Sequence, residues 1–494
     1  MPESRAHSIQ SPRPVQVKNI LETRQGRRVA GAVLGAGFFL LVLFFRNPFF
    51  GQWDSFDYMT KALRHEVSDL AFGRPVFLGI QMAAWESAKR LGLSVTHADW
   101  AGQSVVMLFA LLALVSFYFC AKQLVDSRTA MWGTVALATT PMVVAYSGMI
   151  MTEVPSLTCL IASVGFLLRW QKTRKHWDLV GSALIFAAGV HMREQLITTA
   201  VVFPLVIVLD RRLSGNQRAR AIVVHTAVYW AAIVIVMGWL WWTDAQYLDR
   251  IRFWAGAMGL RKGTLGMQLL ALFKFTLASS LVALIALMTT VRWWSKHLTC
   301  RALAAGMVVL PLLALLADYD LPIQPRYAVV AVPGMILVAL AGLKAAWPMM
   351  SSTRRRRVAA LLWIGQGLFL IGGLGVLLHF NHISAERKAR LETLKMQAPA
   401  HSLFIGGAYT PALVFYRQSG IRPDWQIIYS GWTWDAEQLP VQVAAALHAH
   451  QSVYVLHDAQ AWDYLQSEWQ DVRRLRRNFQ FKEVDGGLEQ ITAK

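Results

Sequence analysis

Four short polar segments interrupt an otherwise apolar sequence, and each contains residue types that could do chemistry. In the first, Asp54 and Asp57 are three positions apart, so a short helix would place both carboxylates on one face. Two carboxylates beside a membrane surface are costly to desolvate, and a catalytic role would justify that cost. The structural alternative is that one caps the helix and the other is solvated. The local sequence leaves both explanations open.

The second segment, residues 147–155, contains Glu153. We expect a very short turn between two membrane spans, with Glu153 at the mouth of the second span. A capping Thr152 followed by an acid and by Pro155 would explain this segment structurally. An ionisable group at membrane depth is nevertheless a functional candidate.

The third and fourth segments each contribute an arginine. Arg193 belongs to a polar cluster, residues 191–195, that is expensive at bilayer depth unless it lines a cavity; its pairing with Glu194 could also be purely structural. Arg326 lies in the fourth segment, residues 318–327. A guanidinium there suits bidentate binding of a phosphate group, whereas the structural alternative is an arginine that snorkels to the interface.

The composition indicates what surrounds these segments. Of the 494 residues, 55% are hydrophobic and 16% are charged, against roughly 25% charged in an ordinary globular protein. Three cysteines are too few for a disulfide framework. A polytopic membrane protein is therefore expected, and disorder, collagen and a small secreted domain are excluded.

Eleven apolar segments are long enough, or nearly so, to cross about 30 Å of hydrocarbon. Two of them, 178–191 and 196–209, are short and could instead form a broken or re-entrant pair. All eleven lie near residues 29–45, 101–121, 130–148, 151–169, 178–191, 196–209, 221–242, 266–290, 301–317, 327–346 and 358–379.

The formal net charge is +20, and the distribution of the basic residues predicts the orientation of the chain in the membrane. Most Lys and Arg residues fall in alternate loops, which the positive-inside rule places in the cytosol, so nucleic acid is an unnecessary partner. The N-terminus is then cytoplasmic, and the four polar segments and the C-terminus lie on the other side. No cleavage site follows the first apolar segment, so we interpret it as an anchor.

Three parts follow from this pattern. Residues 1–28 form a basic cytosolic tail. Residues 29–382 form a transmembrane catalytic domain with an outside loop, 46–100, that includes an amphipathic interfacial stretch over 76–91. Residues 383–494 form an outside domain in which strand-like runs (402–405, 425–429, 452–456) alternate with helix-like runs (440–450, 459–469). The fold class is therefore mainly α, with a small C-terminal α/β domain and a largely parallel sheet.

Taken together, the motifs resemble the membrane glycosyltransferases of the C structural class (GT-C), close to the protein O-mannosyltransferases and the lipid A aminoarabinose transferases. The similarity spans residues 29–346. Its motifs are Asp54 to Tyr58, then Arg74-Pro75 where the family commonly has His-Pro-Pro, Thr152-Glu153, Arg193-Glu194, and Arg326-Tyr327 leading into Pro333.

The resemblance implies transfer of a sugar, with inversion, from a polyprenyl-phosphate donor to an acceptor hydroxyl. The outside is either a periplasm or an organelle lumen; the short loops and the lack of a retention signal favour the periplasmic side of a bacterial inner membrane. It makes Asp54 the general base. Three residues would position the acceptor or a cation: Asp57, Tyr58 and Glu153. Three would bind the lipid phosphate: Arg326, Arg193 and Arg74. Relatives in the wider class use a divalent cation, for which Asp54 and Glu153 are possible ligands, although the spacing shows no dedicated ligand set.

Two other classes of function compete with this one. A transporter or flippase for a lipid-linked sugar would show inverted repeats or paired broken spans near the midplane; the sequence has no repeat, and its acids cluster at one surface. A membrane scaffold that presents residues 383–494 would explain this outside domain but not the four polar segments. On the transferase hypothesis, the acceptor is a protein, a lipid or a glycan, and the outside domain (383–494) recruits it.

Overall fold

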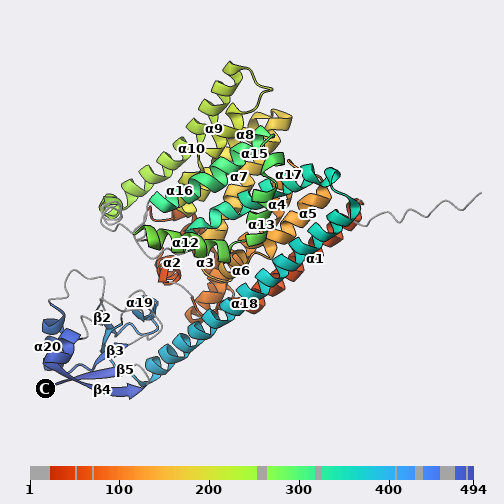
Figure 1. Ribbon diagram of the computed structural model, residues 1–494. Coiled ribbons are helices and arrows are strands. Elements are labelled where there is room, and N and C mark those ends of the chain that lie inside the picture. Colours follow the sequence, from red (N-terminus) through yellow and green to blue (C-terminus); the bar gives the residue numbers. More distant parts are fainter. Residues whose placement is uncertain are drawn as a thin grey trace, which may run out of the picture.

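The computed structural model describes residues 23–50, 53–68, 72–252, 264–317, 325–406, 409–428, 438–456, 473–485 and 488–494. It shows a polytopic, mainly α membrane protein in which a bundle of apolar helices carries a small C-terminal domain at one end (Figure 1). The expected fold class is confirmed.

Among the described helices, six are long and apolar enough to cross a bilayer. They correspond to α1 (Arg24–Phe45), α4 (Ala98–Ala121), α7 (Glu153–Thr173), α10 (Gly215–Thr243), α17 (Ala331–Ala346) and α18 (Ser352–Gln397). The last of these has 46 residues, about 69 Å at 1.5 Å per residue, and it continues beyond the bundle to the C-terminal domain.

The other expected spans are helical but shorter or broken. Pro141 starts a new helix directly after Thr140, because proline lacks the N–H that an unbroken helix would use and disfavours helical geometry in the residue before it. A bend of 95° separates the helices on either side of Ser280. These elements are α5 (Ser127–Ala138), α6 (Pro141–Ser147), α8 (His176–Met192), η3 (Glu194–Thr199), α9 (Val202–Val208), α12 (Leu265–Ala278), α13 (Leu281–Thr289), α15 (Leu298–Leu303), η4 (Ala304–Val309) and α16 (Leu310–Ala317).

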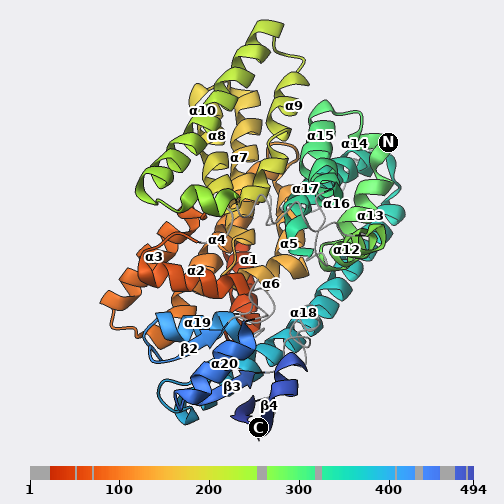
Figure 2. The same cartoon turned by 90° about the vertical axis from the view of Figure 1, so that its left-hand side faces the viewer.

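The loop between α1 and α4 forms two helices that lie across one end of the bundle (Figure 2). They are α2 (Trp53–Arg64) and α3 (Pro75–Arg90). The second coincides with the amphipathic stretch predicted over 76–91. The remaining short helices are η2 (Val95–His97), α14 (Val291–Trp294), η5 (Pro325–Val330) and η6 (Trp347–Met349).

The C-terminal domain is built on a five-stranded sheet with the order β2-β1-β3-β5-β4. The three strands predicted from the sequence are present and parallel, but β4 and β5 form an unpredicted antiparallel hairpin, so the sheet is mixed. The expected helix over 459–469 lies outside the described residues. The domain's elements are β1 (Leu403–Ile405), α19 (Thr410–Gln418), β2 (Gln426–Ile428), α20 (Leu439–His448), β3 (Val453–Leu456), β4 (Phe479–Asp485) and β5 (Leu488–Ala493).

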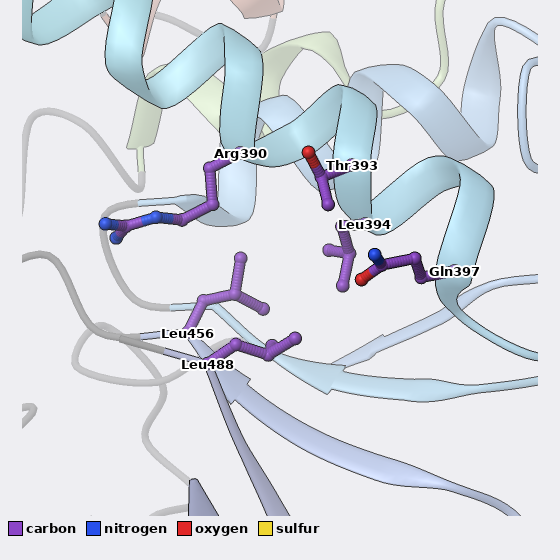
Figure 3. A pocket seen from close by; sticks show the side chains of 6 residues that line it. All are labelled: Arg390, Thr393, Leu394, Gln397, Leu456 and Leu488. Atoms are coloured by element: carbon purple, nitrogen blue, oxygen red, sulfur yellow. The ribbon is translucent and has the colours of Figure 1, made fainter. Parts of the chain in front are cut away.

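The two faces of this sheet bury different clusters, as the alternation of side chains along a strand requires. Leu403 and Ile405 of β1 pack with α20 residues in a small core of their own, whereas Phe404 belongs to a core that is continuous with the helix bundle. Leu394 of α18 joins that larger core together with Leu456 and Leu488. A small pocket remains there between α18 and the strand ends, lined by Arg390, Thr393, Leu394, Gln397, Leu456 and Leu488 (Figure 3). The domain is thus packed onto α18, and the domain boundary expected at residue 383 falls inside that helix.

Gly148 allows a close approach between the bundle and the segment that leads to α2. A Cβ at Gly148 would lie 2.8 Å from the Cα of Arg46, and the Gly148 carbonyl accepts a hydrogen bond from the backbone N–H of Asn47 (3.2 Å). We predict that Gly148→Ala lowers the free energy of unfolding by about 1–3 kcal/mol, because a backbone atom must move to relieve the overlap. Gly375→Ala is the control, since a Cβ there meets no atom within 4 Å. Thermal unfolding in detergent should separate the two variants; equal melting temperatures would contradict the expectation.

Candidate active site

The four polar segments meet at one end of the helix bundle. Asp54 lies in the first turn of α2, and Glu153 is the first residue of α7. The positive end of a helix dipole stabilises a carboxylate at both positions. Arg74 precedes α3, and Arg326 lies in η5. The described residues of all four segments thus lie together at one end of the bundle; Asp318 and Asp320, which begin the fourth segment, lie outside the described residues.

Six side chains form a chain of ion pairs in which positive and negative charges alternate. Arg193 Nη1 is 2.7 Å from Glu153 Oε1, which is 3.7 Å from Arg326 Nε. Arg326 Nη1 is 3.0 Å from Asp54 Oδ2, and Arg74 Nη1 is 3.9 Å from the same oxygen. Arg74 also contacts both carboxylate oxygens of Glu194, at 3.2 and 3.3 Å. We call this set the ion-pair chain; its three guanidinium groups balance its three carboxylates.

Arg193 and Glu194 are at opposite ends of the ion-pair chain although they are neighbours in the sequence. The backbone is extended at Arg193 (φ −157°, ψ 111°), so successive side chains point to opposite sides. The sequence suggested that these two residues pair with each other. In the structure Arg193 instead contacts Glu153, and Glu194 contacts Arg74. Thr152 also differs from expectation: its side chain makes no capping hydrogen bond with α7 and instead accepts one from Arg193 Nη1 (3.2 Å).

Arg74 is held by an unusual backbone conformation. Its φ of +46° and that of Gly73 (+79°) are both in the left-handed region, which costs free energy for a residue with a side chain and is further disfavoured directly before a proline. Such strain persists only where the surroundings over-determine it. Here the guanidinium contacts both Asp54 and Glu194 and also lies over the ring of Tyr58, 5.3 Å from its centroid.

The other two predicted residues of α2 lie beside the ion-pair chain. The Ser68 hydroxyl donates a hydrogen bond to Asp57, which ties α2 to the loop that leads to Arg74. Tyr58 is fully buried, and its ring packs edge-on against Phe77 of α3 (5.2 Å between centroids). Asp57 thus connects α2 to the loop before α3 and Tyr58 connects α2 to α3, whereas Asp54 forms ion pairs with Arg326 and Arg74.

Electrostatics keep Asp54 ionised. Burial raises the pKa of its carboxyl group, but the positive charges of Arg326, Arg74 and Arg193 outweigh burial and hold the pKa below the ordinary value of 3.8. The side chain retains 15% of its exposed surface, in contrast to Arg193 (1%) and Glu153 (0%). Asp54 is thus the more accessible carboxylate, and the Arg193–Glu153 pair lies behind it.

The residues suggested as metal ligands fit a divalent cation poorly. Asp54 and Glu153 both contact Arg326, so a guanidinium lies between the two carboxylates that would share the ion. Within the described part of the chain, no group of three His, Cys, Asp or Glu side chains is arranged to hold a metal.

Glu194 is the participant whose role the sequence did not reveal, because its adjacent arginine offered a simpler partner. The two adjacent residues carry opposite charges, so the sequence carried no signal that either needed a partner from another segment. In the structure the partner of Glu194 is Arg74.

Removing one partner of the fully buried pair should destabilise the protein. We predict that Arg193→Met lowers the free energy of unfolding by about 3–5 kcal/mol, because Glu153 loses its nearest positive charge. The double variant Arg193→Met/Glu153→Leu should be more stable than the single one, since it leaves no unpaired charge. The matched control is Lys344→Met, which breaks an exposed pair with Asp126 (3.4 Å) and should cost less than about 1 kcal/mol. Thermal unfolding measures both losses. If Arg193→Met destabilises the protein no more than Lys344→Met does, the Arg193–Glu153 pair is not a buried pair of this kind.

Comparisons with known proteins concern the sequence and the overall fold. Residues 82–242 match the dolichyl-phosphate-mannose-protein mannosyltransferase family. No curated protein sequence gives a significant match. The fold is similar to that of ArnT from Cupriavidus metallidurans in the apo state, with 11% identity, a TM-score of 0.59 and coverage of 94% of this chain and 98% of that one. The same protein bound to undecaprenyl phosphate gives 12% identity, a TM-score of 0.56 and coverage of 95% and 98%.

An oligosaccharyltransferase from Archaeoglobus fulgidus, tethered to an acceptor peptide with the NVT sequon, is also similar. It gives 11% identity and a TM-score of 0.55, with coverage of 96% of this chain and 74% of that one. The family and the fold neighbours are thus glycosyltransferases. The resemblance expected from the sequence is confirmed, and the protein has the fold of the GT-C membrane glycosyltransferases.

Proposed function

We propose that this protein is an inverting glycosyltransferase that moves a sugar from a polyprenyl-phosphate donor to an acceptor hydroxyl. One observation carries the proposal: the ionised Asp54 carboxylate lies within 3.0 Å of Arg326 and 3.9 Å of Arg74, at the bundle end of a GT-C fold. A base and two anion-binding groups are thus adjacent. This is the combination that an acceptor hydroxyl and a phosphate leaving group require.

In this reaction Asp54 takes the proton of the acceptor hydroxyl as its oxygen attacks the anomeric carbon. The bond from that carbon to the phosphate oxygen breaks on the opposite face, and its electron pair leaves with the lipid phosphate. A positioned general base of this kind contributes about 10²–10⁴-fold to the rate. The low pKa of Asp54 keeps it deprotonated before each turnover.

The lipid phosphate leaves as an anion, so it needs positive charge more than a proton. A guanidinium carries five N–H donors in a planar fork, which allows Arg326 to contact phosphate oxygens while it remains close to Asp54. Arg74 is placed for the same task from the other side of Asp54. Arg193 is buried against Glu153 and supports the site indirectly, through the carboxylate that Arg326 also contacts.

The positive-inside pattern supports a cytoplasmic N-terminus, with the site and the C-terminal domain on the opposite side of the membrane. The short loops favour a bacterial inner membrane, in which that side is the periplasm. A polyprenyl carrier suits this compartment, because soluble nucleotide sugars are scarce there. The acceptor belongs to one of three classes: protein, lipid or glycan.

We predict that Asp54→Asn lowers turnover of a polyprenyl-phosphate sugar by about 10²–10⁴-fold while donor binding is retained, because the amide cannot accept the proton. The assay measures label lost from the lipid carrier in nanodiscs supplied with membrane and cell-wall extract. Asp126→Asn is the matched control, since Asp126 caps α5 and pairs with Lys344 at the far end of α17 from Arg326.

Arg326→Gln should instead weaken donor binding, which equilibrium binding of the labelled lipid measures directly.

Equal consumption of donor by wild type and Asp54→Asn would eliminate Asp54 as the base. Movement of donor across the bilayer without its consumption would show a flippase.

The pH dependence has a definite sign. A carboxyl group whose pKa is depressed in the folded protein stays ionised as the pH falls and loses its charge only below its ordinary range. Turnover should therefore show no decline that depends on Asp54 between about pH 8 and pH 5. The stabilisation that the ionised Asp54 contributes is present above its unfolded-state pKa and is lost at more acidic pH. A kinetic limb between about pH 6 and 7 that shifts in Asp54→Glu would contradict this assignment.

A further inference from the structure

The C-terminal domain touches the helix that carries Asp54. We propose that Phe415 is a positioning residue for the active site: through one aromatic cluster, the C-terminal domain holds α2 and therefore Asp54 in place. The inference rests on the proposed function, which gives Asp54 its role. It assigns the domain a task distinct from recruitment of the acceptor.

The aromatic cluster consists of Phe49, Phe50, Phe56 and Phe415. The ring of Phe50 lies 4.6 Å from that of Phe56 in α2 and 4.7 Å from that of Phe415 in α19, measured between centroids. Phe50 and Phe415 are 2% and 3% exposed, so the contact excludes water. Both views of the molecule place α19 beside α2 (Figures 1 and 2). Phe56 is two residues from Asp54 in α2, so packing of this ring constrains the stretch of helix backbone that carries the carboxylate.

The residue next to Phe415 fixes α19 to α18. The hydroxyl of Tyr416 donates a hydrogen bond to Glu392 of α18 (2.6 Å), and burial together with this bond raises the pKa of the phenol, so that it remains a donor. The Tyr416 ring stacks on Trp425 with an angle of 8° between the planes. Arg422 donates to the carbonyl oxygens of Lys395 and Ala398 (2.6 and 3.1 Å), where α18 ends. Phe415 is thus presented to α2 by a segment that is anchored to a long helix.

The same helix also holds the segment that precedes α2. The Asn381 amide donates to the carbonyl oxygen of Phe45 (2.9 Å), the Asn47 amide donates to Ser384 (3.0 Å), and Lys388 donates to the carbonyl oxygen of Pro48 (3.2 Å). These polar contacts fix the chain before α2, and Phe415 fixes the first turns of α2 itself. Both sets of contacts originate from α18 and the domain attached to it.

Such support matters because α2 has only 12 residues, a length at which a helix in water is marginal without packing. A displacement of about 1 Å at a reacting group can cost on the order of 10²-fold in rate. The ion-pair chain constrains the Asp54 carboxylate at one side of α2, and Phe415 constrains the helix at another.

Hydrogen exchange of the α2 backbone amides in the full-length protein in nanodiscs tests this inference without reference to activity. Phe415→Ala should accelerate exchange of peptides that cover residues 53–64 while those of α17 are unchanged. It should lower kcat by about 10-fold to 100-fold with little change in KM for the donor. Phe415→Leu, which keeps an apolar side chain of similar reach, should restore most of both properties, and it serves as the test variant if the alanine variant does not fold.

The matched control is Phe481→Ala, which removes a partly buried ring from β4 in the separate small core of the same domain. Unchanged exchange of residues 53–64 in Phe415→Ala would overturn the inference, as would equal acceleration by Phe481→Ala. Faster exchange without loss of turnover would also overturn it, because α2 would then be loosened without consequence for Asp54. Wild type that consumes no donor would instead refute the proposed function, and the exchange comparison would still decide whether Phe415 holds α2.

Discussion

Charge balance at one end of a membrane helix bundle is the constraint on which the rest of this structure depends. A buried charge without a partner costs several kcal/mol, and six charged side chains meet here. They are accommodated because their signs alternate along one continuous path, from Arg193 to Glu194. Since these two residues are covalent neighbours, the path closes on itself. Five separate elements must keep their positions for any one pair to remain satisfied.

This closed path explains several local features that would otherwise be costly. Arg74 adopts a left-handed backbone before a proline, and the gain from two carboxylate partners offsets that cost. Thr152 directs its hydroxyl to Arg193 and leaves the first turn of α7 without a side-chain cap. The extended backbone at Arg193 separates two adjacent charges so that each meets a partner from another helix. In each case the local preference of the chain yields to the requirement that no charge stay unpaired.

Much of the site could be predicted from sequence, because Asp54, Glu153 and Arg326 are charged residues at the ends of apolar segments and the charge of the loops places those ends on one side. Their pairing could not be predicted, since it depends on which way Arg193 and Glu194 point. The eleven apolar segments were predicted as helices, but breaks at Pro141 and Ser280 divide two of them into shorter helices. In the C-terminal domain, hydrophobic runs indicated the three parallel strands. The hairpin β4–β5 was missed because charged residues interrupt its apolar alternation, and nothing local to Phe415 indicates that it meets Phe50.

The attachment of α18 to the segment before α2 joins residues that are 334 and 337 positions apart. A ribosome that adds about 5–20 residues per second needs roughly 20–70 s to make the intervening chain. During that interval most of the bundle can insert, but Asn47 has no Ser384 to bind and the chain leading to Asp54 has no partner from α18. The end of the bundle that carries the ion-pair chain is therefore completed only after this part of α18 has been made. A shorter chain in the membrane would carry Asp54 and its arginines without the contacts by which α18 holds the segment before α2.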